Sequence, residues 1–171
     1  MTALLVVVVL VALQRLFELA LSRRNTRRLR ARGAIEHGAA HYPLLVALHA
    51  AWLAGLVVFV PWDTPPDWRL LGVFLLFQIG RVWVIASLGP FWTTRIITLP
   101  GAPLAHRGPY RWVRHPNYLI VAGEIAVLPL AFGAWRFAGV FSILNAVLLW
   151  HRIRIGFLAQ TVEQLKLKLS Q

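Results

Sequence analysis

The chain has 171 residues, of which 58% are hydrophobic, and its mean hydropathy is +0.65. A soluble domain of this length does not need so much apolar surface for one core, so the surplus must face lipid. A formal charge of +12 would indicate nucleic acid in a soluble protein, but here the arginines flank apolar segments. We therefore expect membrane lipids with anionic headgroups as partners, and no nucleic acid. The absence of cysteine excludes disulfides and thiolate-bound metals.

Apolar segments recur along the chain and predict one all-α integral membrane domain over residues 1–171. A membrane-spanning helix needs about 20 mostly apolar residues, so the sequence indicates a bundle of about five transmembrane helices. An amphipathic helical tail on the membrane surface should follow them. The predicted helices lie near 1–22, 42–61, 68–88, 117–133 and 137–151, and the tail covers 155–171.

The basic residues form three groups, which follow the first, third and fifth predicted helices. If five helices alternate across a membrane, all three groups lie on one side, which the positive-inside tendency identifies as the cytoplasm. The opposite loop, from Pro61 to Asp67, is acidic instead. We expect a bacterial inner membrane protein whose chemistry faces the cytoplasm.

Some polar residues interrupt the predicted spans. We expect Arg15 and Glu18, three positions apart, to form a snorkelling pair near the cytoplasmic end, with a substrate contact as the alternative. Arg81 either snorkels or lines a site, and His49 is predicted to be a hydrogen-bonded bundle histidine. The arginines from 23 to 32 read as a loop that signals topology. No metal site is expected, because no third ligand accompanies the two histidines of the segment 37–41.

Potentially reactive side chains concentrate in Arg114-His115-Pro116-Asn117-Tyr118. Proline suits the first turn of a helix, so a helix should start at His115 or Pro116, and its free N–H groups favour an anionic group such as a cofactor carboxylate. The segment Phe91–Ile97 suits an interfacial entrance. Glu124, inside an apolar span, should face the protein interior, in either a hydrogen-bonded structural role or a cofactor contact.

These residues carry a resemblance to a known family. Arg114-His115-Pro116-Asn117-Tyr118, preceded by Gly108-Pro109-Tyr110 and followed by an apolar hairpin and Arg152-Ile153-Arg154, resembles the isoprenylcysteine carboxyl methyltransferase family. The earlier segments Gln14–Leu19, Ser22–Asn25 and His41–Pro43 are similar to its compact bacterial branch. Some members of that branch methylate alkylpyrones or alkylresorcinols.

The resemblance implies methyl transfer from S-adenosylmethionine to an oxygen of an amphiphilic acceptor. The acceptor group is either an isoprenylcysteine-type carboxylate or an alkylpyrone or alkylresorcinol hydroxyl. A carboxylate needs no general base, whereas a hydroxyl must lose its proton, which makes His115, His151 or a carboxylate relevant. The C-terminal helical hairpin would enclose the cofactor. The implied catalytic residues are Arg152 and Arg114, and the implied cofactor-binding residues are His115, Pro116, Tyr118, Leu119, Glu124 and Tyr110.

One departure from the family pattern favours a different hypothesis. The pattern Arg-Ile-x-x-Glu-Glu ends here in Gly156 and Phe157, and Glu163 is the only acid that follows. The alternative is therefore a non-catalytic membrane protein that binds cofactor or lipid. A small transporter or channel is a weaker hypothesis, because charge within the predicted spans is sparse.

Overall fold

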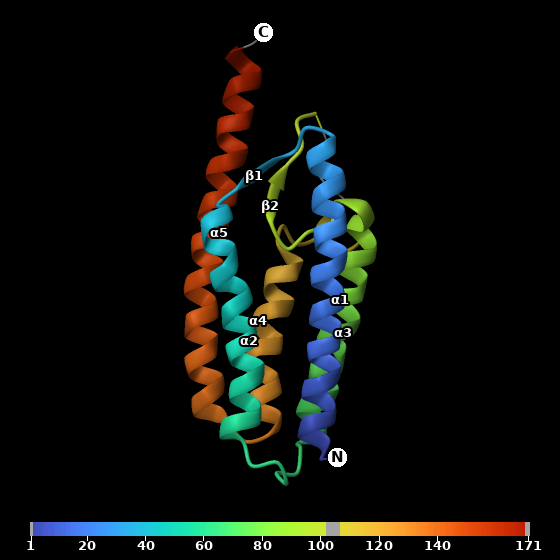
Figure 1. Cartoon of the computed structure of the whole chain (residues 1–171), viewed down its shortest axis with the longest axis vertical. Helices are drawn as coiled ribbons and strands as arrows, with labels where there is room; N and C mark the ends of the chain where they lie inside the picture. Colours follow the sequence, from blue (N-terminus) through green and yellow to red (C-terminus); the bar gives the residue numbers. More distant parts are fainter. Residues whose placement is uncertain (1, 102–106, 170–171) are drawn as a thin grey trace.

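The computed structural model describes residues 2–101 and 107–169, and in these ranges the chain forms an elongated all-α bundle (Figure 1). The fold class predicted from the sequence is confirmed. The bundle consists of α1 (Ala3–Ala31), α2 (Tyr42–Phe59), α3 (Trp68–Leu88), α4 (Pro116–Ala131) and α5 (Trp135–Leu169). The connections contain the short 3-10 helices η1 (Ala39–His41), η2 (Gly89–Phe91) and η3 (Gly108–Arg111), and the strands β1 (Ile35–His37) and β2 (Ile96–Thr98).

Four helical segments of the described chain are long and apolar enough to cross a membrane, and α4 is a shorter apolar helix of 16 residues. Large apolar side chains cover the outside of the bundle, as a lipid environment requires. Examples are Phe17, which is 68% exposed, Leu76, which is 66% exposed, and Ile143, which is 67% exposed. The four segments are Ala3–Ala31, Ala39–Phe59, Trp68–Phe91 and Trp135–Ala159.

Glycines allow close packing between α3 and α4 and between α2 and α5. A Cβ atom on Gly123 would lie 2.2 Å from the ring of Phe77, and one on Gly55 would lie 2.6 Å from the ring of Phe137. Small residues at these positions allow α4 to approach α3, and α2 to approach α5. Buried side chains, including Trp52, fill the end of the bundle that holds the N-terminus. The cavity described below lies nearer the other end of the bundle.

Two helices extend beyond their predicted ends. The arginines from 23 to 30 belong to α1 rather than to a loop, and Arg32 is its C-cap, because arginine is a good helix former and no glycine or proline interrupts the segment. Likewise α5 continues without a break to Leu169, so residues 155–169 of the predicted tail form the end of a 35-residue helix and not a separate element. Residues 170 and 171 of that prediction lie outside the described residues. The turn between α4 and α5 is short and contains Gly133 at φ +70.

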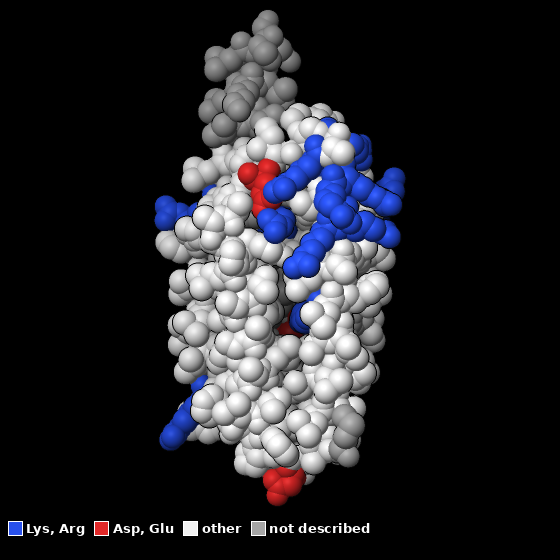
Figure 2. Space-filling model, viewed as in Figure 1, with Lys and Arg blue, Asp and Glu red and all other residues white. Residues whose placement is uncertain are grey.

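Charge divides the two ends of the bundle. Most basic side chains gather at the end where β1 and β2 lie, whereas the opposite end shows a small acidic spot and few basic atoms (Figure 2). At the acidic end, Asp67 caps α3 by accepting from the backbone N–H of Arg69 at 2.8 Å. The strands at the basic end are antiparallel, with Glu36 opposite Ile97. We call this two-stranded element the strap.

Candidate active site

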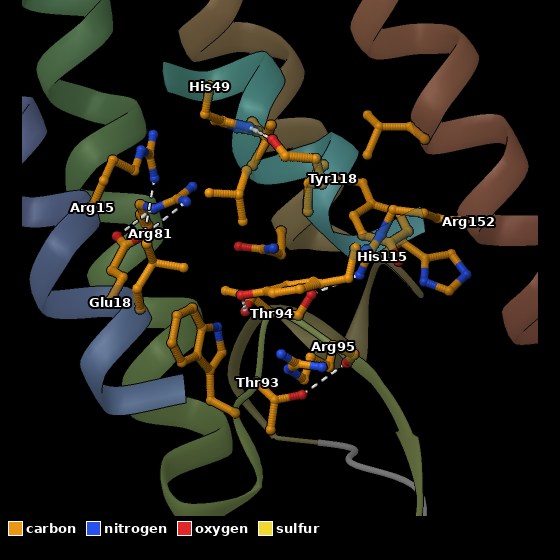
Figure 3. Close-up of a pocket in the computed structure, with 18 of the residues that line it drawn as sticks. Arg15, Glu18, His49, Arg81, Thr93, Thr94, Arg95, His115, Tyr118 and Arg152 are labelled. Carbon is orange, nitrogen blue, oxygen red and sulfur yellow. Dashed lines mark hydrogen bonds and ion pairs between the residues drawn. The ribbon is translucent and has the colours of Figure 1, made fainter. Parts of the chain in front are cut away.

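A cavity of about 440 Å³ opens inside the basic half of the bundle. Figure 2 shows a hollow on one face with charged atoms inside it, and Figure 3 shows the side chains that line the cavity. All five helices contribute to its walls, together with η3 and the segment 92–95 that leads into β2. Most of the lining is apolar, and the polar side chains fall into the groups described below.

The first group consists of four charged residues from three helices, of which Arg15 is partly buried and the other three are buried. Glu18 of α1 accepts hydrogen bonds from Arg81 of α3 at 2.5 and 2.9 Å and from Arg15 at 3.0 Å. Glu124 of α4 accepts from Arg15 at 2.6 Å, from Arg81 at 3.0 Å and from Gln78 at 2.8 Å. Glu18, Arg81 and Glu124 are at most 4% exposed. We call Arg15, Glu18, Arg81 and Glu124 the charge quartet.

The quartet corrects the expectation of a snorkelling pair. Two arginines and two glutamates cancel each other's charge inside the protein, so neither Arg15 nor Glu18 needs to reach the interface. Arg81 lines the cavity and does not snorkel. Glu124 faces the protein interior as predicted, but both of its carboxylate oxygens are occupied by the quartet and Gln78, and it does not line the cavity.

The second group centres on Thr94, in the segment that leads into β2. Its hydroxyl lies 2.8 Å from the hydroxyl of Ser22 and 2.9 Å from that of Tyr42. Its carbonyl accepts from the Nη2 of Arg152 at 2.8 Å. Arg152 is 4% exposed, and its buried Nε–H has no hydrogen-bond partner in the described chain. The side chain of Arg152 is therefore fixed in place while one donor is left for a ligand.

The third group comes from the start of α4, where Pro116 occupies the first turn as predicted. The rings of His115 and Tyr118 stack, with centroids 5.3 Å apart. Asn117 also lines the cavity, and its buried Oδ1 has no partner among the described residues. Leu119 is 61% exposed and lies outside the lining, because consecutive helical residues point about 100° apart.

The structure thus brings five of the eight predicted site residues to one cavity. Tyr110, Arg114, His115, Tyr118 and Arg152 line it, whereas Pro116, Leu119 and Glu124 do not. Figure 3 shows His115 and Arg152 on one side of the cavity and the quartet residues Arg15, Glu18 and Arg81 on the other.

Two groups near the mouth of the cavity are held in their neutral forms. Burial and the charge of Arg114 lower the pKa of His115 below its ordinary value. Burial, reinforced by Tyr118, raises the pKa of Tyr110 to about 12. At pH 7 the phenol of Tyr110 is therefore protonated and the imidazole of His115 is neutral, so both can exchange hydrogen bonds with a ligand without adding charge.

The strap continues from the segment 92–95 that lines the cavity, and one carboxylate connects it to its neighbours. Glu36 of β1 accepts hydrogen bonds from Arg30 of α1 and from Arg95, which precedes β2. The guanidinium of Arg95 also lies 4.1 Å from the ring centroid of Tyr42. The strap therefore connects α1, α2 and the segment that carries Thr94.

Lowering the pH should loosen the strap. Burial raises the pKa of Glu36, but the hydrogen bonds and charges of Arg95 and Arg30 outweigh it and hold the pKa below the ordinary value of 4.5. The stabilisation is fully present above pH 4.5 and is lost as the pH falls through the lowered pKa. The protection of the amides of residues 96–98 against hydrogen exchange, relative to an unfolded chain at the same pH, should fall as Glu36 becomes protonated. Glu36→Gln should exchange rapidly at every pH, and an unchanged exchange rate in this variant would contradict the assignment.

Several lining residues were not predicted as site residues. Trp92 and Thr94 belong to a segment that we expected at a lipid-facing entrance, but Trp92 is 1% exposed and both line the cavity. His49 and Tyr42 also line the cavity. The sequence signal for them was a polar aromatic residue at the start of the helix predicted at 42–61 and a histidine inside it. In the described part of the chain, no cluster of three or more potential metal ligands exists.

The two positions that depart from the family pattern carry no acid into the cavity. Gly156 faces Ile96 of β2, where an added Cβ atom would lie 4.0 Å from a side-chain carbon. Phe157 is 65% exposed on the outer face of α5. Among the residues that line the cavity, Glu18 is the acid present. Its carboxylate already accepts hydrogen bonds from Arg15 and Arg81.

The fold and the cavity define a small all-α protein with membrane-spanning helices and an internal polar site. Residues 70–156 match the profile of the isoprenylcysteine carboxyl methyltransferase (ICMT) family, and this chain belongs to that family. YpbQ of Bacillus subtilis (strain 168), an uncharacterized protein, is 41% identical over 86% of this chain and 90% of its own length. An uncharacterized protein of Haemophilus influenzae is 29% identical over 62% of this chain and 64% of its length. No solved structure gives a significant match.

Proposed function

We propose that this protein is an S-adenosylmethionine-dependent O-methyltransferase that acts on an amphiphilic acceptor at the cytoplasmic face of a bacterial inner membrane. Family membership suggests a membrane methyltransferase. The observation that carries the proposal further is the cavity, whose lining residues Asn117 and Arg152 have buried polar atoms without partners among the described residues. Such atoms are costly to bury unless a ligand completes their hydrogen bonds.

The residues at the start of α4 fit the cofactor. Bound S-adenosylmethionine would supply an electrophilic methyl group on a sulfonium. Tyr118 and His115 offer stacked rings beside the cavity, and aromatic faces attract cations and stack on planar groups. Asn117 Oδ1 offers an acceptor for an amine, and Arg114 and the first backbone N–H groups of α4 favour a carboxylate.

The chain's own residues would then orient the acceptor and exclude water. Arg152 lines the cavity and is held by the carbonyl of Thr94, and its Nε–H has no partner among the described residues, so we assign it the role of holding an acceptor oxygen. The segment 92–95, which leads into the strap, lines one part of the cavity, and apolar side chains such as Leu16 and Leu53 line another. The apolar part suits the hydrocarbon tail of the acceptor. The acceptor oxygen belongs to a carboxylate or to a hydroxyl.

The basic end of the bundle faces the cytoplasm in this proposal. The arginines at the end of α1 and those around η3 lie at this end, and the turn between α2 and α3 at the other end carries Asp63 and Asp67. By the positive-inside tendency the N-terminus is then outside. Cofactor made in the cytoplasm would reach the cavity from the side of the strap.

Replacing Tyr118 with alanine should weaken cofactor binding about tenfold or more, because the stacked aromatic wall is lost. Tyr118→Phe keeps the ring and should bind within about threefold of the parent. Calorimetric titration of the purified protein with S-adenosylmethionine measures both. Equal affinity of Tyr118→Ala and the parent would contradict the placement of the cofactor, and no binding by the parent would contradict the proposed function.

The alternative is a binding protein without turnover, favoured by Gly156 and Phe157, which bring no acid to the cavity. It predicts cofactor binding without methyl transfer to any acceptor.

A further inference from the structure

We propose that His49, together with Arg15, recognises a hydroxyl group on the acceptor, and that His49 takes up its proton during methyl transfer. The inference rests on the proposed function and selects a phenol or enol, rather than a carboxylate, as the acceptor group. It follows from two polar groups on the wall of the cavity opposite His115 and Arg152 (Figure 3).

The first group is the imidazole of His49, on α2. Its Nδ1 lies 2.9 Å from the backbone carbonyl of Leu45, one helical turn earlier. A carbonyl only accepts hydrogen bonds, so Nδ1 carries the proton and the neutral ring has a bare lone pair on Nε2. No residue in the described ranges hydrogen-bonds to Nε2. The local helix thus fixes one tautomer and leaves a proton acceptor in the cavity.

The second group is the guanidinium of Arg15, on α1. Its two terminal nitrogens are committed to Glu18 and Glu124, at 3.0 and 2.6 Å. Its buried Nε–H has no partner in the described structure. Arg15 and His49 both line the cavity, and the charge of Arg15 acts on His49. A buried donor without a partner next to a fixed acceptor is a site for a group that can both accept and donate.

A hydroxyl satisfies both requirements and a carboxylate does not. A phenol or enol can accept from Arg15 Nε–H and donate to His49 Nε2 at the same time. An ionised carboxylate would place its lone pairs against that of Nε2. The charged groups that influence His49 are Arg15 and Glu18 from α1 and Arg81 from α3. The helices α4 and α5 line the cavity with the apolar Val121 and Leu149 and with the polar Asn117, Tyr118 and Arg152.

The reaction balances with His49 as the base. The hydroxyl oxygen forms a bond to the methyl carbon of the sulfonium donor, and the carbon–sulfur bond breaks with its electron pair on sulfur, giving a neutral thioether. The hydroxyl proton moves to Nε2, giving an imidazolium. The imidazolium releases the proton to water when the methyl ether departs. General bases of this kind contribute about 100-fold or more to rate.

Binding without cofactor provides the first test. The probes are a long-chain alkylphenol and its own methyl ether, titrated against the detergent-solubilised protein. The parent should prefer the phenol about tenfold, as expected for hydrogen bonds that only the free hydroxyl can donate. His49→Phe, which keeps a ring but no nitrogen, should lose the preference. An equal preference in His49→Phe and the parent would overturn the proposal.

Turnover provides the second test, with His49→Gln as a variant that can accept a hydrogen bond but cannot take up a proton. Its kcat should fall about 100-fold or more on the alkylphenol. Its rate on an alkyl nitrophenol that is ionised before it binds should not fall below the parent's, because no base is then needed. His37→Gln is the control, because His37 bonds Thr98 of the strap and does not line the cavity.

The two proposals fail in distinguishable ways. If the parent methylates the alkylphenol and His49→Gln does so at the same rate, the role of His49 is wrong and the methyltransferase proposal stands. If the parent methylates only a carboxylate acceptor, the hydroxyl assignment is wrong. If the parent methylates nothing, the proposed function fails, and the binding preference still tests the hydroxyl site.

Discussion

Replacing Glu124 with glutamine should lower the free energy of unfolding by about 3 kcal/mol or more, the largest stability effect that we expect from one substitution. The substitution removes the negative charge opposite Arg15 and Arg81 at 2.6 and 3.0 Å. Three charges then remain in the buried quartet, with one positive charge in excess. Breaking a buried ion pair is costly because the remaining charge is desolvated without compensation. Thermal unfolding in a fixed detergent, followed by circular dichroism, measures the change.

A second variant separates charge balance from packing. Arg81→Gln combined with Glu124→Gln leaves the neutral pair of Arg15 and Glu18, at 3.0 Å. The double variant should be more stable than the sum of the two single changes predicts, by about 1 kcal/mol or more. Asp63→Asn, at the exposed turn between α2 and α3, should change stability by less than about 0.5 kcal/mol. Strict additivity of the two quartet substitutions would contradict the coupling.

Arg152→Ala should reduce the rate of methyl transfer about 100- to 1000-fold, the largest effect on activity that we expect outside the acceptor base. The substitution removes both the Nε donor and the anchor to Thr94, which the guanidinium reaches at 2.8 Å. Arg152→Lys should recover little of the rate, because an ammonium cannot replace a planar fork that makes two directed contacts. Single-turnover measurements with saturating cofactor separate this effect from cofactor binding.

The matched control is Arg154→Ala. Arg154 lies on the same helix and is exposed, with its guanidinium 4.8 Å from the ring centroid of Trp150, and it does not line the cavity. It should keep the parent's rate within about twofold, since surface changes away from the site have small effects. If Arg152→Ala transferred methyl groups as fast as Arg154→Ala, Arg152 would not hold the acceptor.

The membrane helices were predictable where hydropathy and helix limits coincide. The segment predicted at 68–88 is α3, because Asp67 caps its start and Gly89 follows its end. The limits of α1 and α5 were not predictable from hydropathy, since their basic extensions continue the helix after the apolar run has ended. The strap was also missed, because strands of three residues are made by pairing across the chain rather than by their own sequence pattern.

The sequence predicted which residues belong to the candidate site better than it predicted the contacts between them. Motif residues such as Tyr118 and Arg152 line the cavity. The charge quartet depends on pairs that are far apart in sequence, such as Arg15 and Glu124, which are 109 positions apart. No local pattern connects them. Leu119 was grouped with the cofactor residues by its position in the motif, but the helical period turns it outward.

The most direct test of the central claim is transfer of a labelled methyl group from S-adenosylmethionine to an organic-extractable product by the purified protein. An isoprenylcysteine analogue and a long-chain alkylphenol should be offered side by side, with cofactor binding confirmed in the same preparation. Labelled product from an acceptor is the predicted result, and the proposed hydroxyl site predicts the alkylphenol. Bound cofactor without labelled product from either acceptor would contradict the account and favour a binding protein without turnover.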